Sequence, residues 1–80
     1  MALTEQIRLS DIPLVARLVL SSPHKYLSSS YDEEADVLYI NFKKPAVATD
    51  SELTDDDIII RYEGEEVVGL TVLHANARAR

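Results

Sequence analysis

The segment from Tyr31 to Ile40, YDEEADVLYI, constrains the fold most strongly, because an acidic turn runs directly into an aromatic and β-branched strand. Asp-rich clusters are typical of turns, whereas Val, Ile and Tyr favour the pleated surface of a sheet. The later segment IIIRYEGEEVVGLTVL, from Ile58 to Leu73, has the same strand character around a central glycine. The two segments together predict a small antiparallel sheet.

The composition fits a single thin domain and argues against several classes of function. The chain has 80 residues, of which 46% are hydrophobic, and a formal net charge of -6, which would repel a phosphate backbone. We therefore expect no nucleic-acid partner. The sequence contains no cysteine, so it offers neither disulfides nor a thiolate nucleophile.

No segment of the sequence has the length of a membrane span. The longest apolar run, from Leu14 to Leu20, is interrupted by Arg17 and is far shorter than the roughly 20 residues that cross a bilayer. The first residues also lack the pattern of a secretory signal, because Glu5 and Asp11 lie where an apolar stretch would be needed. We expect a cytoplasmic protein that is not attached to a membrane.

A helix is predicted near the N-terminus. Ser10, Asp11 and Pro13 are typical of a helix start, since Ser10 can cap an amide and Asp11 suits the positive end of the helix dipole. The next apolar residues share one helical face: Leu14, Val15, Leu18 and Val19. Residues 21–23 end the element. The run 14–20 also fits a strand. The apolar residues among 1–9 follow neither the period of a helix nor that of a strand.

Strand patterns separated by turn residues fill most of the remaining chain. Five strands are predicted at Lys25–Tyr31, Val37–Lys43, Ala46–Leu53, Asp57–Glu63 and Glu65–His74. Because the connections are short, each strand is expected to pair with the next one along the chain. The predicted fold is α+β, a five-stranded antiparallel β-meander with an N-terminal helix. Residues 1–24 are its helical extension, 25–76 its sheet domain and 77–80 its tail.

Both faces of this sheet carry apolar residues. We predict that Leu38, Ile40 and Phe42 belong to the core, since a single helix can cover one face. The other face is left for a protein interface, and its candidate residues are Val37, Tyr39, Ile59 and Leu73. An uncovered face predicts self-association, most simply as a homodimer.

The hairpin in the segment RYEGEE has two alternative registers. A two-residue loop at Glu63–Gly64 sets Arg61 opposite Glu66 as an ion pair, whereas a three-residue loop pairs Ile60 with Val68. The two registers differ by one residue and therefore swap the faces of the strand. The cross-strand ion pair favours the first.

Gly69 interrupts the last predicted strand. A glycine inside a strand marks a bulge or the close approach of another group. We predict that an aromatic side chain, such as Tyr39 or Tyr62, packs over it.

The polar clusters match no catalytic, cofactor or metal site. The acidic turn lacks the alternating ligands and central glycine of a calcium loop, so Asp32 is expected to form an Asx-turn while the other carboxylates are solvated. These carboxylates are Asp32, Glu33, Glu34 and Asp36. His24 and His74 lack zinc-ligand spacing, and residues 28–30 offer serines with no adjacent base. We expect no enzymatic activity.

Two motifs carry a family resemblance. The first consists of Tyr31, Asp32, Glu34, Ala35, Asp36, Leu38, Tyr39 and Ile40, and the second of Gly64, Val67, Val68, Gly69 and Ala75. With these residues, about 25–76 of the chain resembles the bacterial family called domain of unknown function 2283. The resemblance implies a small antiparallel sheet and no established activity. Residues 1–24 and a shortened turn before Gly64 depart from the family's pattern.

The expected function is that of a non-enzymatic protein-interaction module. Some members of the resembled family are similar to the smaller partner in toxin and antitoxin gene pairs, which implies a small basic protein as a second type of partner beside a homodimer. The alternative is a small metal-binding or hydrolytic protein that uses the acidic turn and a histidine.

Overall fold

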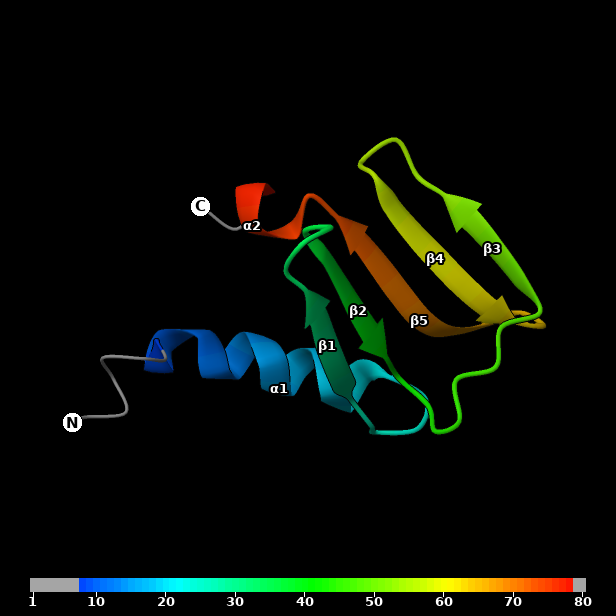
Figure 1. Ribbon diagram of the computed structural model, residues 1–80. Helices are drawn as coiled ribbons and strands as arrows, with labels where there is room; N and C mark the ends of the chain where they lie inside the picture. Colours follow the sequence, from blue (N-terminus) through cyan, green and yellow to red (C-terminus); the bar gives the residue numbers. More distant parts are fainter. Residues whose placement is uncertain (1–7, 79–80) are drawn as a thin grey trace.

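The computed structural model describes residues 8–78, which form one five-stranded sheet and three helical segments (Figure 1). The elements in chain order are η2 (Leu9–Asp11), α1 (Ile12–Ser21), β1 (Ser28–Asp32), β2 (Val37–Asn41), β3 (Asp50–Leu53), β4 (Ile58–Glu63), β5 (Glu66–Leu73) and α2 (Ala75–Arg78). The predicted α+β fold, with five antiparallel strands and an N-terminal helix, is confirmed. Residues 1–7 of the predicted extension and 79–80 of the predicted tail lie outside the described residues.

The strand order is β1-β2-β5-β4-β3, so the predicted meander order was wrong. The last strand enters the middle of the sheet and pairs with β2 on one side and β4 on the other. The prediction assumed that strands adjacent in sequence must pair. Residues 42–49, however, give the chain eight residues between β2 and β3. This linker is long enough to pass the roughly 14 Å that three strand spacings occupy.

The sequence of β5 suits its central position in the sheet. EVVGLTVL is an almost continuous apolar run, which is typical of an interior strand rather than of an edge strand. The edge strands β1 and β3 read SSSYD and DSEL, and both are short and polar. Edge strands of this kind discourage pairing with the edge of another sheet.

The hairpin between β4 and β5 turns through two residues, Gly64 and Glu65. Glu63 pairs with Glu66 across the turn. The loop therefore begins one residue later than the favoured prediction, which placed it at Glu63–Gly64. Gly64 has a φ of 63°, and a positive φ at the first loop position is the requirement of a type II′ turn.

A β-bulge follows this turn and shifts the register. It leaves Val68 without an opposite residue on β4, and Arg61 lies opposite Gly69 rather than Glu66. The Val68 carbonyl accepts a hydrogen bond of 2.9 Å from the Phe42 amide, just beyond the end of β2. Both predicted registers were wrong, because the loop is Gly64–Glu65 and because each prediction assumed an unbroken ladder beyond it.

The buried core within residues 8–78 is small. The apolar side chains that are at most 9% exposed are Val37, Phe42, Val68 and Ala75. The prediction that Phe42 is a core residue is confirmed by its 6% exposure. Leu38 and Ile40, predicted to be in the core as well, are only half-buried.

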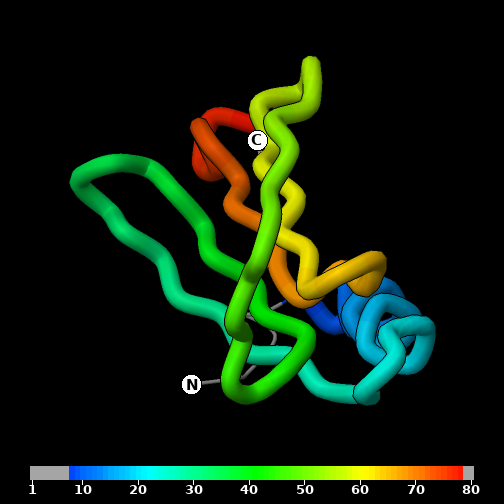
Figure 2. The backbone as a smooth tube through the Cα atoms, turned by 90° about the vertical axis from the view of Figure 1, so that its right-hand side faces the viewer, coloured from blue at the N-terminus to red at the C-terminus, as the bar shows by residue number. Residues whose placement is uncertain are grey.

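Helix α1 explains this incomplete burial. None of the residues in Ile12–Ser21 is buried, so the expectation that the helix covers a face of the sheet was wrong. Figure 2 shows α1 on one side of the sheet, beside the β4–β5 hairpin, and Figure 1 shows its first turns extending past β1. The predicted cap is also absent: Ser10 lies in η2, and no side-chain hydrogen bond caps Ile12–Ser21.

Helix α2 occupies part of the segment that was predicted as a tail. Arg78 Nε donates a hydrogen bond of 3.1 Å to the Leu73 carbonyl, and Arg78 Nη2 donates to the Asp56 carbonyl. These two bonds attach α2 to the end of β5 and to the turn between β3 and β4.

Arg61, rather than an aromatic residue, packs over Gly69. Its Nη2 donates to Asn41 Oδ1 at 2.6 Å and to the Ile40 carbonyl at 3.2 Å. A Cβ atom added at Gly69 would lie 2.5 Å from Arg61 Cζ, which is far closer than van der Waals contact. The prediction of Tyr39 or Tyr62 was wrong because the bulge places Arg61 directly opposite the glycine.

We predict that Gly69→Ala destabilises the fold through Arg61. The new methyl group displaces the guanidinium and breaks its hydrogen bonds to Asn41 and Ile40, for an expected loss of about 1–3 kcal/mol in urea unfolding. The same substitution in an Arg61→Leu background should cost less than half as much, because the obstructing group is gone. Equal costs in the two backgrounds would show that the guanidinium is not the cause.

Candidate interaction surface

Helix α1 exposes apolar side chains along its whole length. Leu14 is 59% exposed and Leu20 is 65% exposed, and three further residues are 40–50% exposed: Ile12, Val15 and Leu18. Arg17 is the only charged residue between Ile12 and Ser21. A surface helix of a globular protein ordinarily buries such an apolar stripe against the core. Helix α1 is therefore an apolar helix that residues 8–78 leave largely uncovered.

One face of the sheet is uncovered as well, and we call it the open face. The strand register places six apolar side chains on it: Leu38, Ile40, Ile58, Ile60, Leu70 and Val72. Leu70 and Val72 belong to the central strand and are nevertheless only half-buried. Because β2 and β4 flank these two residues within the sheet, they are exposed only in the direction perpendicular to the sheet, where little packs over them.

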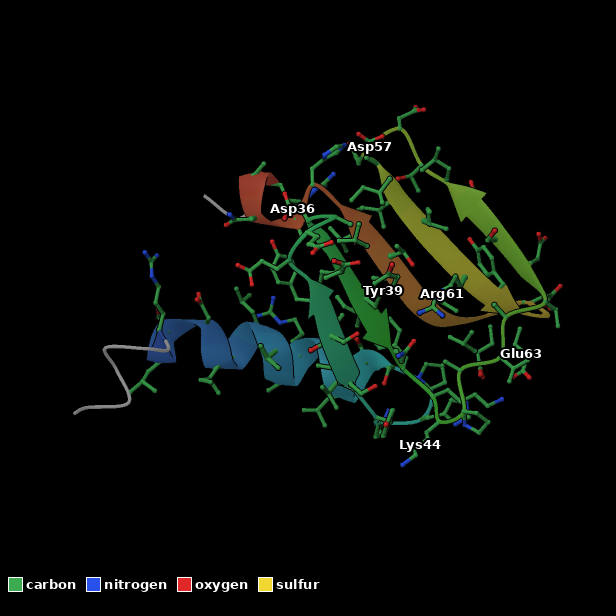
Figure 3. All side chains as sticks on the ribbon, viewed as in Figure 1. Asp36, Tyr39, Lys44, Asp57, Arg61 and Glu63 are labelled. Carbon is green, nitrogen blue, oxygen red and sulfur yellow. The ribbon has the colours of Figure 1, made fainter. Side chains whose placement is uncertain are left out.

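The opposite face, which we call the closed face, is sealed by its own side chains. Gly69 and Thr71 of the central strand are both buried on it. The Arg61 side chain lies over Gly69, and Tyr39 and Ile59 flank Thr71 on the two neighbouring strands. Figure 3 shows Tyr39 and Arg61 over the middle of the sheet. The closed face needs no helix to cover it.

The predicted interface residues all lie on the closed face. Val37 is opposite Leu73, and Tyr39 and Ile59 both lie opposite Thr71 of the central strand. Val37 is only 9% exposed between its cross-strand neighbours, so its predicted availability was wrong. Tyr39 is 38% exposed, while Ile59 and Leu73 are half-buried. Sequence reasoning missed α1, because the helix was assigned to the core.

An apolar hollow of about 270 Å³ lies between the end of α1 and the open face. Its lining residues are Leu18, Ser21, Ser22, Pro23, Phe42, Val67 and Leu70. Beyond this end of the helix, Lys25 Nζ donates locally to the Ser22 carbonyl at 3.2 Å. The long-range contact is that of His24 Nε2, which lies 2.8 Å from Glu66 Oε1 and joins the segment after α1 to the start of β5.

The acidic turn is organised by hydrogen bonds within the protein. Asp32 Oδ1 accepts a bond of 3.2 Å from the Ala35 amide, which fits the predicted turn-forming role of this aspartate. Asp36 has a φ of 56°, a left-handed conformation that Asp tolerates better than most residues. Its Oδ1 accepts bonds of 2.7 Å from both the Tyr31 hydroxyl and the Asn76 amide. Asp36 therefore joins the β1–β2 turn to α2 (Figure 3).

The same contacts perturb the ionisation of both side chains. The Tyr31 hydroxyl, followed by the Asn76 amide, holds the pKa of the Asp36 carboxyl below its usual value. The hydrogen bond to Asp36 raises the pKa of Tyr31. Asp36 is thus stabilised as the carboxylate.

The two histidines lie at opposite ends of β5. His24 contacts Glu66 at its start, whereas His74 follows its end and has its Nε2 3.8 Å from Asp57 Oδ2. Eight extended residues separate these ends by roughly 27 Å. Within residues 8–78, no three His, Asp or Glu side chains are grouped in a way that could hold a metal ion.

A comparison with protein families matches residues 29–76 to the family described as protein of unknown function, DUF2283. The chain belongs to the DUF2283 family. The matched region begins in β1 and ends in α2, so it contains the whole sheet except Ser28 and leaves α1 outside. No curated protein and no solved structure matches the chain significantly. Among residues 8–78 of this DUF2283 protein, no helix is long and apolar enough to cross a membrane.

We predict that Asp36 contributes stability that depends on pH. Because its pKa is lower in the folded state, the contribution is complete above the unfolded pKa, near 3.9, and is lost as the pH falls through the folded value. Asp36→Asn should therefore lower the urea midpoint at pH 7, and the difference from the parent protein should shrink as the pH is lowered from 5 to 2.

Glu34→Gln is the matched control for this measurement. Glu34 is exposed in the same turn and loses the same charge on substitution. Its midpoint should stay near that of the parent protein at every pH. An Asp36→Asn midpoint that differs from the parent by the same amount at pH 7 and pH 2 would contradict the assigned role.

Proposed function

We propose that this protein is a non-enzymatic, cytoplasmic interaction module that works as a homodimer. The observation that carries the proposal is the exposure of α1, a ten-residue helix with no buried residue and one charged residue. The open face of the sheet supplies a second apolar surface in the same chain. Contiguous exposed apolar surfaces of this kind mark protein interfaces.

The energetics favour covering these surfaces. Completing the burial of a half-exposed Leu, Ile or Val side chain is worth about 1 kcal/mol. Five such residues lie on α1, so the unused stabilisation is comparable to the whole stability of a small domain, about 5 kcal/mol. Association is a direct way for a chain with so small a core to gain this free energy.

The charge distribution permits two acidic copies to meet. The carboxylates are concentrated in turns and at strand ends, as in residues 32–36, 55–57 and 63–66. The open face carries apolar residues on β2, β5 and β4, and α1 carries no carboxylate. Contact through these surfaces leaves the acidic turns of both copies in solvent, where repulsion is screened.

We predict that the protein sediments at twice the monomer mass of 8.9 kDa at micromolar concentrations. Leu14→Asp should weaken the dimer by about 30-fold in Kd, because the two Leu14 side chains of the dimer each lose about 1 kcal/mol of apolar burial, or about 2 kcal/mol together. Leu14 is 59% exposed, so the variant should keep the parent circular dichroism spectrum. Analytical ultracentrifugation over a range of concentrations measures the effect.

Tyr39→Asp is the matched control on the closed face. Tyr39 is also exposed, at 38%, and belongs to the surface first predicted from the sequence. Its dimer constant should be unchanged if the interface uses α1. A parent protein that stays monomeric at all concentrations would contradict the homodimer and favour a different partner, such as a small basic protein.

The alternative, a metal-binding or hydrolytic protein, is tested by calorimetry, because such a protein would bind a metal ion and the proposed interaction module would not. Asp32 and Asp36 already accept hydrogen bonds within the protein, which leaves fewer carboxylate oxygens for a cation. Titration with Ca²⁺, Mg²⁺ or Zn²⁺ should therefore give no stoichiometric heat at micromolar protein. A one-to-one signal that Asp32→Asn abolishes would support the alternative.

A further inference from the structure

Two surfaces of different shape are left largely uncovered by the part of the chain that the structure describes. One is the convex apolar surface of α1, and the other is the flat open face of the sheet. A helix on one face of a sheet is among the common layered arrangements of protein domains. The chain therefore contains both halves of such a layer, but its own α1 does not complete it.

The attachment of α1 explains why it leaves its own sheet uncovered. The end of the helix is fixed to the β4–β5 hairpin through His24 and Glu66, and only its last turn lines the hollow against Phe42 and Leu70. The first turns extend past β1, the edge strand (Figure 1). Leu14 and Val15, which lie in these turns, are consequently 59% and 47% exposed.

We infer that the dimer forms by reciprocal docking, in which α1 of each copy lies on the open face of the other. This inference rests on the proposed homodimer and adds its geometry. The occupant of each open face is the helix of a second copy.

Charge complementarity supports this choice. The only charge on α1 is positive, at Arg17, and Arg8 precedes η2. Strand β3 borders the open face, and the register places its Asp50 and Glu52 on that face, opposite Tyr62 and Ile60. A basic helix thus meets the acidic border of an apolar sheet, although the chain as a whole has a net charge of -6.

The size of the contact supports reciprocity. Helix α1 has ten residues and is therefore about 15 Å long. One contact of this length falls short of the about 800 Å² per subunit that a stable dimer typically buries. A two-fold axis places the same contact at both sites, which doubles the buried area and leaves no open face for further growth.

The absence of cysteine from the sequence allows a direct test by cross-linking. Leu14→Cys protein and Ile60→Cys protein are mixed, equilibrated and treated with a short bis-maleimide. Reciprocal docking brings Leu14 of one copy over β4 of the other, so the mixed cross-linked dimer should exceed either homodimeric product. Ser30→Cys, exposed on the closed face opposite Tyr39, replaces Ile60→Cys in the control and should give little mixed product.

A charge exchange provides a second test with surface residues. Arg17→Glu should weaken the dimer about 3- to 5-fold, as expected for a partly exposed ion pair. Glu52→Lys in the same chain should restore the parent constant, whereas a purely local effect of Arg17→Glu would not be rescued.

The outcomes separate this inference from the proposed function. If the protein is a dimer but Leu14→Cys mainly links to itself, the helices pack on each other and reciprocal docking is wrong. If the protein is a dimer and neither mixed linking nor rescue occurs, the interface lies elsewhere. A monomer at all concentrations contradicts both the homodimer and its geometry.

Discussion

The pairing of β5 along both of its edges holds the rest of the structure in place. The strand joins the β1–β2 unit to the β4–β3 unit, which have no other ladder between them. Its bulge at Val68 frees a carbonyl that binds the Phe42 amide, and its start and end lie beside the attachment points of the two helices. A central apolar strand with both edges satisfied also removes the most aggregation-prone segment from solvent.

The two faces of the sheet carry different chemical groups. On the closed face, a guanidinium lies over a glycine and is held by an amide oxygen and a main-chain carbonyl, so polar groups fill the space above β5. Arg61 Nε is buried without a hydrogen-bond partner among the described residues, a local loss that the packing of the face must offset. The open face carries aliphatic side chains and needs an apolar cover. The asymmetry determines which side of the sheet is available to another protein.

Strand positions and fold class followed from sequence because alternation and turn residues are local signals. The strand order did not, because β2 and β5 pair over a long sequence separation that no local pattern encodes. The predicted register failed first at the turn, whose loop is Gly64–Glu65, and again at the bulge. The extra residue of the bulge, Val68, looks like any other strand valine in the sequence. Gly69 indicated a close approach, but the identity of the covering residue, Arg61, depended on that same register.

The candidate surface was predicted less well than the fold. Helical periodicity located α1 correctly. An amphipathic pattern does not indicate, however, whether the apolar side chains face the sheet of the same chain or another molecule. The contact between His24 and Glu66, which are 42 positions apart, holds the end of α1 beside the β4–β5 hairpin, and no local sequence pattern encodes it. Asp36 was expected to be solvated, whereas its bond to Asn76 joins residues 40 positions apart.

The bond between Asp36 and Asn76 also bears on how chains of this family could diversify. Asn76 is the last matched residue of the family region, so this region is closed by its own turn and short helix. Helix α1 precedes it and is joined through the few residues between Ser21 and Ser28. In the proposed dimer, the sheet supplies the surface that receives a helix, and the segment before the family region supplies the helix that docks. Because α1 belongs to no ladder of the sheet, replacing this helix is expected to change the docking partner while every strand keeps its register.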